Sequence, residues 1–198
     1  MKKNQIRIVG GAYRRTPISV PDGDHLRPTP DRVRETLFNW LAYFWDGTFA
    51  GRRVLDLFAG TGALGFEAAS RGVETAQLVE QAPTALAGLR AVQARLRSPA
   101  VRIHAGDARA FLRAQPAPSY DLVMLDPPFG AGWLPRLLPL LDRALLPGGL
   151  LYLESEAPLD APPEWELLRQ GRAGQVHYGL IRFAATQKNM NNDRLETP

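Results

Sequence analysis

One segment in the first third of the chain limits the folds open to it more than any other. Residues 54–65 read VLDLFAGTGALG, an apolar run that passes through glycines into a helix-forming stretch. A strand that turns directly into a helix through glycines is typical of nucleotide-binding α/β proteins, because glycine lets the backbone approach a ligand where a side chain would collide. Gly60, Gly62 and Gly65 match the pattern G-x-G-x-x-G. Glu80 lies 20 residues after Gly60, at a predicted strand end where an acid could bind a ribose.

From residue 53 onward, short apolar runs alternate with segments of helical periodicity, the order expected of βα units around a parallel sheet. The run LVML at residues 122–125 is apolar throughout, as a strand buried on both faces should be. We therefore predict an α/β fold with a mostly parallel seven-stranded sheet that ends in an antiparallel C-terminal edge hairpin. The predicted strands are Arg53–Phe58, Thr75–Val79, Val101–His104, Asp121–Leu125, Gly149–Leu153, Glu164–Arg169 and Val176–Phe183, and the predicted helices are Ala63–Arg71, Thr84–Arg97, Ala108–Ala114 and Trp133–Leu145.

The segment before this sheet is predicted to form a small β-hairpin and one helix. The hairpin strands are Ile6–Val9 and Pro17–Val20. Thr29 is a candidate cap for a helix that starts at Pro30, and Arg32 and Arg34 fall off the apolar stripe of that helix. We divide the chain into a basic N-terminal extension of residues 1–50, a catalytic domain of residues 51–185 and a disordered tail of residues 186–198.

A second motif, Asp126-Pro127-Pro128-Phe129, follows the apolar run 122–125 directly. Proline has no backbone N–H and a fixed φ, so this loop presents carbonyl acceptors in a rigid arrangement at the end of a buried strand. A carboxylate and a fixed carbonyl can together accept both protons of an exocyclic amine, and an aromatic ring can stack on a flat base. The candidate catalytic residues are therefore Asp126, Pro127 and Phe129.

The two motifs together resemble those of S-adenosylmethionine-dependent amino-methyltransferases. Asp56-x-Phe58-x-Gly60-x-Gly62 is similar to the first motif of that superfamily, and Asp126 to Phe129 is similar to its fourth. The resemblance implies a Rossmann-like class I fold with S-adenosylmethionine as cofactor. It also implies that Glu80 binds the ribose and that the segment at Asp107 and Ala108 contacts the adenine. The implied cofactor-binding residues are Asp56, Phe58, Gly60, Gly62, Glu80, Asp107 and Ala108.

Further segments make the resemblance more specific and extend it over residues 6 to 184. The chain resembles the bacterial small-subunit ribosomal RNA guanine-N2 methyltransferases of the RsmD type. This family implies methylation of one guanine amine in small-subunit ribosomal RNA, within an assembled or assembling subunit. We also expect a monomer, and we expect it in the cytoplasm because no targeting segment is visible at the N-terminus. The segments that carry the resemblance are Arg7–Gly11, Leu26–Thr29, Arg32–Leu41, Tyr152-x-Glu154-x-Glu156 and Ala173–Val176.

The charge distribution supports a nucleic-acid substrate independently of this resemblance. The chain carries a net charge of +4, but residues 1–53 hold ten basic and five acidic residues, whereas the remainder holds fourteen and fifteen. The excess positive charge is therefore N-terminal, where arginine can pair with phosphate groups. The candidate RNA-binding residues are Arg7, Arg14, Arg15, Arg27, Arg32 and Arg34, and Tyr13 is a candidate stacking partner.

Composition excludes several other chemistries. The chain contains no cysteine, which rules out disulfides, zinc–thiolate sites and thiol catalysis. Its three histidines are scattered without the spacing of a metal site, and a sulfonium methyl group is already activated, so we expect no metal. Charges and prolines interrupt the most apolar stretch, Leu134 to Leu153, so we expect no membrane span. Glu154 and Glu156 are interpreted as charges at the sheet edge.

The residues alone leave three other functions open. A DNA or protein amino-methyltransferase, acting for example on adenine N6 or cytosine N4, could use the same Asp126 loop. A nicotinamide-dependent oxidoreductase could use the same glycine loop, although Asp56 and the Asp126 loop argue against it. A non-catalytic RNA-binding module would have no use for an intact Asp126-to-Phe129 motif.

Overall fold

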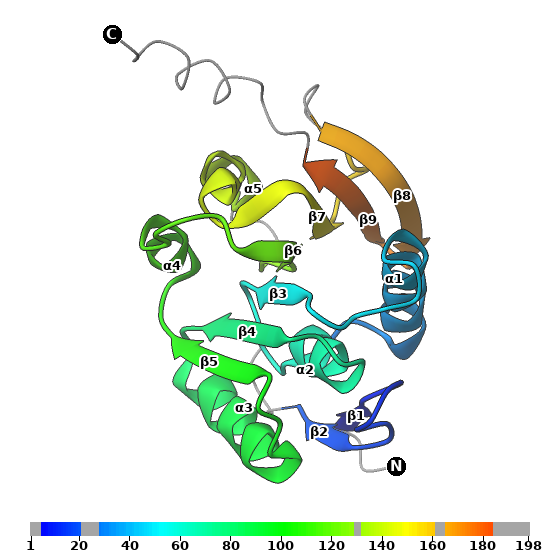
Figure 1. Cartoon of the computed structure of the whole chain (residues 1–198), viewed down its shortest axis with the longest axis vertical. Coiled ribbons are helices and arrows are strands. Elements are labelled where there is room, and N and C mark those ends of the chain that lie inside the picture. Colours follow the sequence, from blue (N-terminus) through cyan, green and yellow to red (C-terminus); the bar gives the residue numbers. More distant parts are fainter. Residues whose placement is uncertain (1–4, 21–27, 129–131, 161–164, 184–198) are drawn as a thin grey trace, which may run out of the picture.

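A single mixed β-sheet forms the centre of the protein (Figure 1). The structure is a computed structural model and describes residues 5–20, 28–128, 132–160 and 165–183. Seven strands lie in the order β5-β4-β3-β6-β7-β9-β8. The first five are parallel to one another, and β9 is antiparallel to both of its neighbours, β7 and β8. This confirms the predicted Rossmann-like α/β fold with a mostly parallel seven-stranded sheet and an antiparallel C-terminal edge hairpin. The strands are β3 (Arg53–Asp56), β4 (Thr75–Glu80), β5 (Val101–Ala105), β6 (Tyr120–Leu125), β7 (Leu145–Ser155), β8 (Trp165–Ala173) and β9 (Val176–Phe183).

Helices cover both faces of the sheet, as a parallel sheet requires. Side chains alternate along each strand, so Val54 packs into one hydrophobic cluster and the adjacent Leu55 into the other. The first cluster includes residues of α1 (Asp31–Phe44), α2 (Ala63–Ser70) and α3 (Pro83–Leu96). The second includes residues of α4 (Ala108–Arg113), α5 (Leu134–Leu137) and the 3₁₀ helix η1 (Leu138–Arg143).

The strand order places a topological switch point between the neighbouring strands β3 and β6. Strand β3 is paired with β4 on one side and with β6 on the other, and β6 is followed by β7. In open α/β sheets, ligands bind at the carboxyl ends of the strands around such a point. The glycine loop follows β3 and the Asp126 loop follows β6, so the fold brings the two sequence motifs to the same edge.

The prediction of one continuous helix over Trp133–Leu145 was wrong. The segment is divided into the four residues of α5 and the 3₁₀ helix η1, and β7 begins directly at Leu145. Proline at position 139 has no backbone N–H to donate and crowds the preceding turn, which prevents a continuous α-helix. The edge strand β8 is also longer than predicted, because it continues from Arg169 to Ala173.

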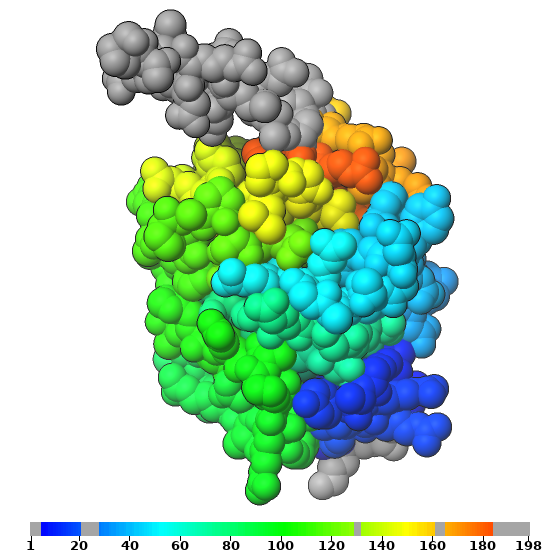
Figure 2. All heavy atoms as spheres, viewed as in Figure 1, coloured from blue at the N-terminus to red at the C-terminus, as the bar shows by residue number. Residues whose placement is uncertain are grey.

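A buried carboxylate attaches the N-terminal hairpin to the sheet domain. The hairpin pairs β1 (Gln5–Arg7) with β2 (Pro17–Ser19), and its isoleucines enter the same hydrophobic cluster as α2. Glu67 of α2 accepts hydrogen bonds of 2.7 and 2.8 Å from the backbone N–H groups of Val9 and Gly10. In Figure 2 the hairpin, in dark blue, lies on the outside of the larger body. Its backbone is therefore fixed while much of its polar surface stays exposed.

Candidate active site

The glycine loop has the backbone that its sequence predicts. Gly60 and Gly62 have φ angles of 50° and 80°, in the left-handed region that favours glycine. A Cβ atom at Gly62 would also lie 2.3 Å from the ring of Phe66, closer than any real contact. A side chain at either position would therefore distort the turn between β3 and α2.

Asp56 lies beneath this loop and is almost fully buried. Its Oδ2 atom accepts a hydrogen bond of 3.0 Å from the backbone N–H of Gly65, which joins the end of β3 to the first turn of α2. Burial raises the pKa of Asp56 to about 7, with smaller contributions from the nearby charges of Glu80 and Glu154. Asp56 can therefore organise the loop from below and change charge near neutral pH.

Glu80 holds the other side of the loop. Its two carboxylate oxygens accept backbone N–H groups from Gly60, Gln81 and Ala82, each at 2.8 Å. A carboxylate has about four acceptor positions, so these bonds fix its orientation and still leave capacity for a ligand hydroxyl. This geometry suits the ribose-binding role expected from the sequence.

Asp107 lies in the next loop along the sheet edge. The backbone N–H of Gly106 donates to the carbonyl of Glu80 at 2.8 Å, so the loops after β4 and β5 are directly connected. Asp107 is half-exposed and caps α4 by accepting from the N–H of Ala110 at 2.9 Å. Ala108 is buried in the first turn of the same helix. Asp107 thus has a structural role in addition to the adenine contact expected from the sequence.

The Asp126 carboxyl group lies across the switch point from Asp56. Asp56 pairs with Met124 in the sheet, and Asp126 follows two residues later on the same face. Pro127 is buried and Pro128 is exposed, so the rigid loop leads from the core to the surface. Burial, followed by the charges of Glu154 and Asp56, raises the pKa of Asp126 well above its usual value. Phe129 lies outside the described residues, and its stacking role stays a prediction.

Asp126 belongs to a hydrogen-bonded cluster that also contains Thr29, Tyr152 and Glu154. Sequence reasoning gave none of these three residues a role in the site. The Thr29 hydroxyl lies 2.9 Å from Glu154 Oε1 and 3.5 Å from Asp126 Oδ2, and the Tyr152 hydroxyl donates to Glu154 Oε1 at 2.8 Å. The interpretation of Glu154 as an edge charge was wrong, since only 6% of it is exposed.

The capping role predicted for Thr29 was also wrong. The helix cap residue is Pro30, and no side chain bonds to the helix start. The Thr29 hydroxyl instead points toward Glu154. One signal for this cluster was available in the sequence: Tyr152 and Glu154 alternate along a strand and so must share one face.

Arg34 was predicted to bind RNA, but its position in the structure excludes this role. Its side chain is fully buried, bonded to Asp31 and to the backbone carbonyls of Thr29 and Arg7, and lies 3.5 Å from Glu67. Contacts with the hairpin at Arg7 and with Glu67 of α2 cover this side of the helix, which periodicity predicted to be exposed. The prediction of a phosphate contact for Arg34 was therefore wrong.

Four other predicted arginines keep surface positions, and one cannot be placed. Arg14, Arg15 and Arg32 are exposed. Arg7 is also exposed and forms a surface ion pair of 3.1 Å with Asp31. Arg27 lies outside the described residues. Tyr13, the predicted stacking partner, is half-buried and anchored through its backbone N–H to Ser70.

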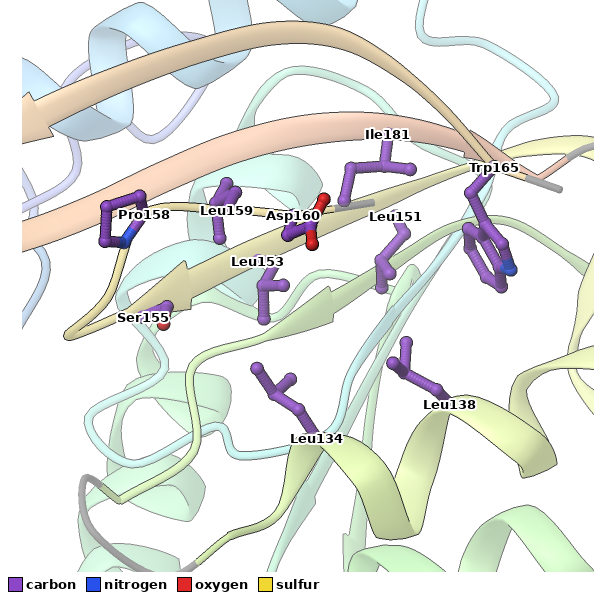
Figure 3. A pocket seen from close by; sticks show the side chains of 10 residues that line it. All are labelled: Leu134, Leu138, Leu151, Leu153, Ser155, Pro158, Leu159, Asp160, Trp165 and Ile181. Carbon is purple, nitrogen blue, oxygen red and sulfur yellow. The ribbon is translucent and has the colours of Figure 1, made fainter. Parts of the chain in front are cut away.

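A separate apolar pocket lies behind β7 (Figure 3). Leu134 and Leu138 point across it toward Leu151 and Leu153, and its polar lining groups are Ser155 and Asp160. None of the predicted site residues lines it. Neither the glycine loop nor the Asp126 loop borders this pocket, so we place the candidate active site at those two loops instead.

The fold defines the protein as a class I methyltransferase. A family model described as "Conserved hypothetical protein 95" matches residues 6–182. The Ribosomal RNA small subunit methyltransferase D of Escherichia coli K12 is 42% identical over 186 residues, which cover 91% of each chain. Its Haemophilus influenzae counterpart is 36% identical over 187 residues, which cover 91% of this chain and 95% of that one.

Solved structures agree with these sequence comparisons. The Escherichia coli protein yhhF superposes with a TM-score of 0.80 at 39% identity, over 92% of this chain and 99% of that one. The chain therefore belongs to the RsmD-type family. Within the described part of the chain, no helix has the length and apolar character needed to cross a membrane.

Proposed function

We propose that the protein transfers a methyl group from S-adenosylmethionine to the exocyclic N2 amine of a guanine in small-subunit ribosomal RNA. The observation that carries this proposal is the placement of Asp126 and the Pro127 backbone at the end of β6, beside the glycine loop that follows β3. The groups that can accept the protons of an amine therefore lie next to the loop that can bind the cofactor, at the same switch point. The relatives named small-subunit ribosomal RNA methyltransferase support the choice of RNA.

The residues present fit the proposed cofactor. A left-handed glycine turn gives a ligand close access to the backbone, and the Glu80 carboxylate can accept hydrogen bonds from ribose hydroxyls. When bound, the cofactor supplies a sulfonium methyl group that is electrophilic without further activation. The protein then has mainly to position the two reactants, which is a large source of rate enhancement.

The Asp126 loop performs the positioning on the substrate side. The amine of guanine is a poor nucleophile because its lone pair is delocalised into the ring. A carboxylate oxygen of Asp126 and the carbonyl of Pro127 can accept its two protons and favour the pyramidal form, in which the lone pair points away from both acceptors. Transfer would form the nitrogen–methyl bond and break the sulfur–methyl bond, with S-adenosylhomocysteine as the leaving group, and one amine proton would go either to Asp126 or to water.

The exposed arginines of the N-terminal segment complete the proposal. Arg7, Arg14, Arg15 and Arg32 would contact phosphates, with the RNA lying over the hairpin and the start of α1. We further propose that a monomeric, cytoplasmic enzyme acts on an assembled or assembling small subunit, because folded RNA and ribosomal protein could together present one guanine.

Transfer of labelled methyl groups from S-adenosylmethionine tests this function. The acceptors are naked small-subunit RNA, the same RNA with ribosomal proteins bound, and whole subunits, followed by nucleoside analysis. We expect label in N2-methylguanosine, most of it with the protein-containing acceptors. Label found only in N6-methyladenosine would overturn the guanine assignment. Calorimetric titration with S-adenosylhomocysteine and with NAD separates the methyltransferase from the oxidoreductase.

A further inference from the structure

Thr29 connects the start of α1 to the proposed catalytic loop. Its hydroxyl oxygen lies 2.9 Å from Oε1 of Glu154 and 3.5 Å from Oδ2 of Asp126, residues that are 125 and 97 positions away in the sequence. Of the described residues, Thr29 is the one whose side chain bonds to Asp126. The contact reaches a single carboxyl oxygen, so it constrains the rotation of the group.

The number of protons in this cluster fixes the direction of its hydrogen bonds. The hydroxyls of Thr29 and Tyr152 each carry one proton, and both lie within 2.9 Å of Glu154 Oε1. The shorter of the two Thr29 contacts is the one to Glu154, so the threonine proton points there. The same proton also faces Asp126 Oδ2 at the longer distance, so Thr29 donates mainly to Glu154 and more weakly to Asp126 in a three-centre hydrogen bond.

Thr29 itself is held from two sides. Only 3% of it is exposed, and Nε of the buried Arg34 donates to its backbone carbonyl at 3.2 Å. Arg34 is fixed in turn by Asp31 at 2.6 Å and by the carbonyl of Arg7 at 2.7 Å. The hydroxyl therefore cannot turn away from the two carboxyl groups without breaking buried hydrogen bonds, which is costly.

The register of the sheet explains why the two carboxyl groups meet. Met124 pairs with Tyr152 across β6 and β7, so Asp126 and Glu154 occupy matching positions two residues further on. Both side chains point to the face that α1 covers, where Thr29 lies between them. A purely structural packing role does not require two facing acids at this point, because burying carboxylates costs free energy.

We propose that Thr29 is a positioning residue for methyl transfer, whose hydroxyl, oriented by Glu154 and Tyr152, fixes Asp126 with its second carboxyl oxygen directed at the target amine. The proposal rests on the function proposed above. Thr29 touches neither substrate nor cofactor in this role. It acts through Asp126 and keeps the acceptor oxygen at the angle that the transfer requires.

Glu154 has a second, electrostatic effect on Asp126 in this arrangement. The acids around Asp126 are Glu154 on β7 and Asp56 on β3, and Glu154 also faces Tyr152, which in turn faces Tyr178 on β9. The charge of Glu154 raises the pKa of Asp126. Methyl transfer should therefore decline on the acidic side at a higher pH than it would without Glu154, because a protonated Asp126 has lost acceptor capacity.

Four variants of the full chain test the proposal, each assayed for methyl transfer and for binding of S-adenosylhomocysteine. Thr29→Val keeps the shape and removes the hydroxyl, whereas Thr29→Ser keeps the hydroxyl. Glu154→Gln keeps an acceptor for Thr29 and Tyr152 and removes the charge. Thr36→Val is the matched control, because the Thr36 hydroxyl only bonds to the backbone of its own helix, at Arg32.

We expect Thr29→Val to lower kcat about tenfold to a hundredfold, with the dissociation constant of S-adenosylhomocysteine within about threefold of wild type. Thr29→Ser and Thr36→Val should stay within about threefold of wild-type kcat. A Thr29→Val enzyme with wild-type kcat would overturn the positioning role. Equal losses in Thr29→Val and Thr29→Ser would overturn it as well, because the hydroxyl would then be irrelevant.

The pH profile tests the role of Glu154 separately and does not depend on the folding of Thr29→Val. The acidic limb of kcat/KM should move to lower pH in Glu154→Gln, whereas an unmoved limb would overturn that role. If the wild-type protein transfers no methyl group to guanine N2, the proposed function fails. If it transfers normally and only the Thr29 and Glu154 results disagree, this inference fails alone.

Discussion

The carboxylate of Glu80 accepts a hydrogen bond of 2.8 Å from the backbone N–H of Gly60. The bond joins the end of β4 to the first glycine of the loop after β3. The backbone carbonyl of Glu80 also accepts from Gly106 in the loop after β5. Three consecutive loops at the carboxyl edge of the sheet are thus connected through one residue, and these hydrogen bonds hold the backbone of the proposed cofactor site in place.

Glu80→Gln should weaken cofactor binding about tenfold or more, because a charged acceptor is replaced by an amide that has one oxygen instead of two. Calorimetric titration with S-adenosylhomocysteine measures the change. Glu74→Gln is the control, since Glu74 is an exposed acid next to the same strand. Equal affinity in the Glu80 variant and the wild type would exclude Glu80 as a ribose ligand.

Asp126→Ala should abolish methyl transfer, with a loss in kcat of about a hundredfold to ten-thousandfold, while the affinity for S-adenosylhomocysteine changes by no more than about fivefold. Asp126→Asn should retain more activity than Asp126→Ala, because it keeps one acceptor oxygen. Asp142→Ala, an exposed acid on η1, serves as the control. Near-normal turnover of Asp126→Ala would contradict the assignment of the Asp126 loop as catalytic.

The local patterns of the sequence were sufficient to predict the sheet and its two functional loops. The glycine turn after Asp56 and the prolines after Asp126 both act through backbone geometry that depends on residues within a few positions. The parallel arrangement of the strands then follows from the βα alternation. These features need no knowledge of distant contacts, which is why they could be read in advance.

The contacts of Thr29, Arg34 and Glu154 could not be read in this way. Each pairs with residues far away in the sequence, and a periodicity argument treats a polar residue as exposed unless it lies on an apolar stripe. Burial of Arg34 against Glu67 overrides that assumption, because paired charges can be accommodated inside a protein. The alternation of side chains along a strand did place Glu154 on the same face as Tyr152. Only the register between β6 and β7 brings Glu154 opposite Asp126.

The pKa of Asp56, about 7 in the folded protein, predicts how its contribution to stability varies with pH. The folded state holds the Asp56 proton more tightly than the unfolded state, whose value is near 3.8. The contribution of this group to stability must therefore fall as pH rises between these two values. Urea unfolding of wild type and Asp56→Asn from pH 4 to pH 8 measures it.

Asp56→Asn keeps an acceptor for the N–H of Gly65 and removes the titration. The free energy of unfolding of the wild type, relative to this variant, should decline between pH 4 and about pH 7 and level off above that. A constant difference would show that the carboxyl group has an ordinary pKa in the folded protein.

Glu67→Gln should destabilise the protein by about 3 kcal/mol, because it breaks a buried ion-pair cluster and leaves cationic partners without a counter-charge. Glu67 is fully buried and bonded to Arg71 at 2.9 Å, with Arg34 at 3.5 Å and the N-terminal hairpin held by the same carboxylate. Urea unfolding gives the free energy. The control Glu74→Gln, at an exposed acid, should stay within about 0.5 kcal/mol of wild type. A similarly small change in Glu67→Gln would show that Glu67 does not attach the hairpin to the sheet domain as proposed.

Replacing Arg14 and Arg15 together by glutamine should weaken RNA binding and reduce its dependence on salt. Both side chains are exposed at the hairpin turn, and the hydrogen bond between the Arg15 N–H and the Ile8 carbonyl is made by the backbone, so the hairpin should keep its structure. If each arginine neutralises one phosphate, the slope of log K against log salt should become less negative by about 1.4 to 1.8 in total.

Arg113→Gln with Arg143→Gln is the matched control for this variant. It removes the same charge from α4 and η1, whose residues pack against the opposite face of the sheet. Fluorescence anisotropy with labelled small-subunit RNA at several salt concentrations gives the slope for each protein. If the two double variants lose affinity and slope equally, net charge alone explains the binding, and the hairpin has no specific contact with phosphate.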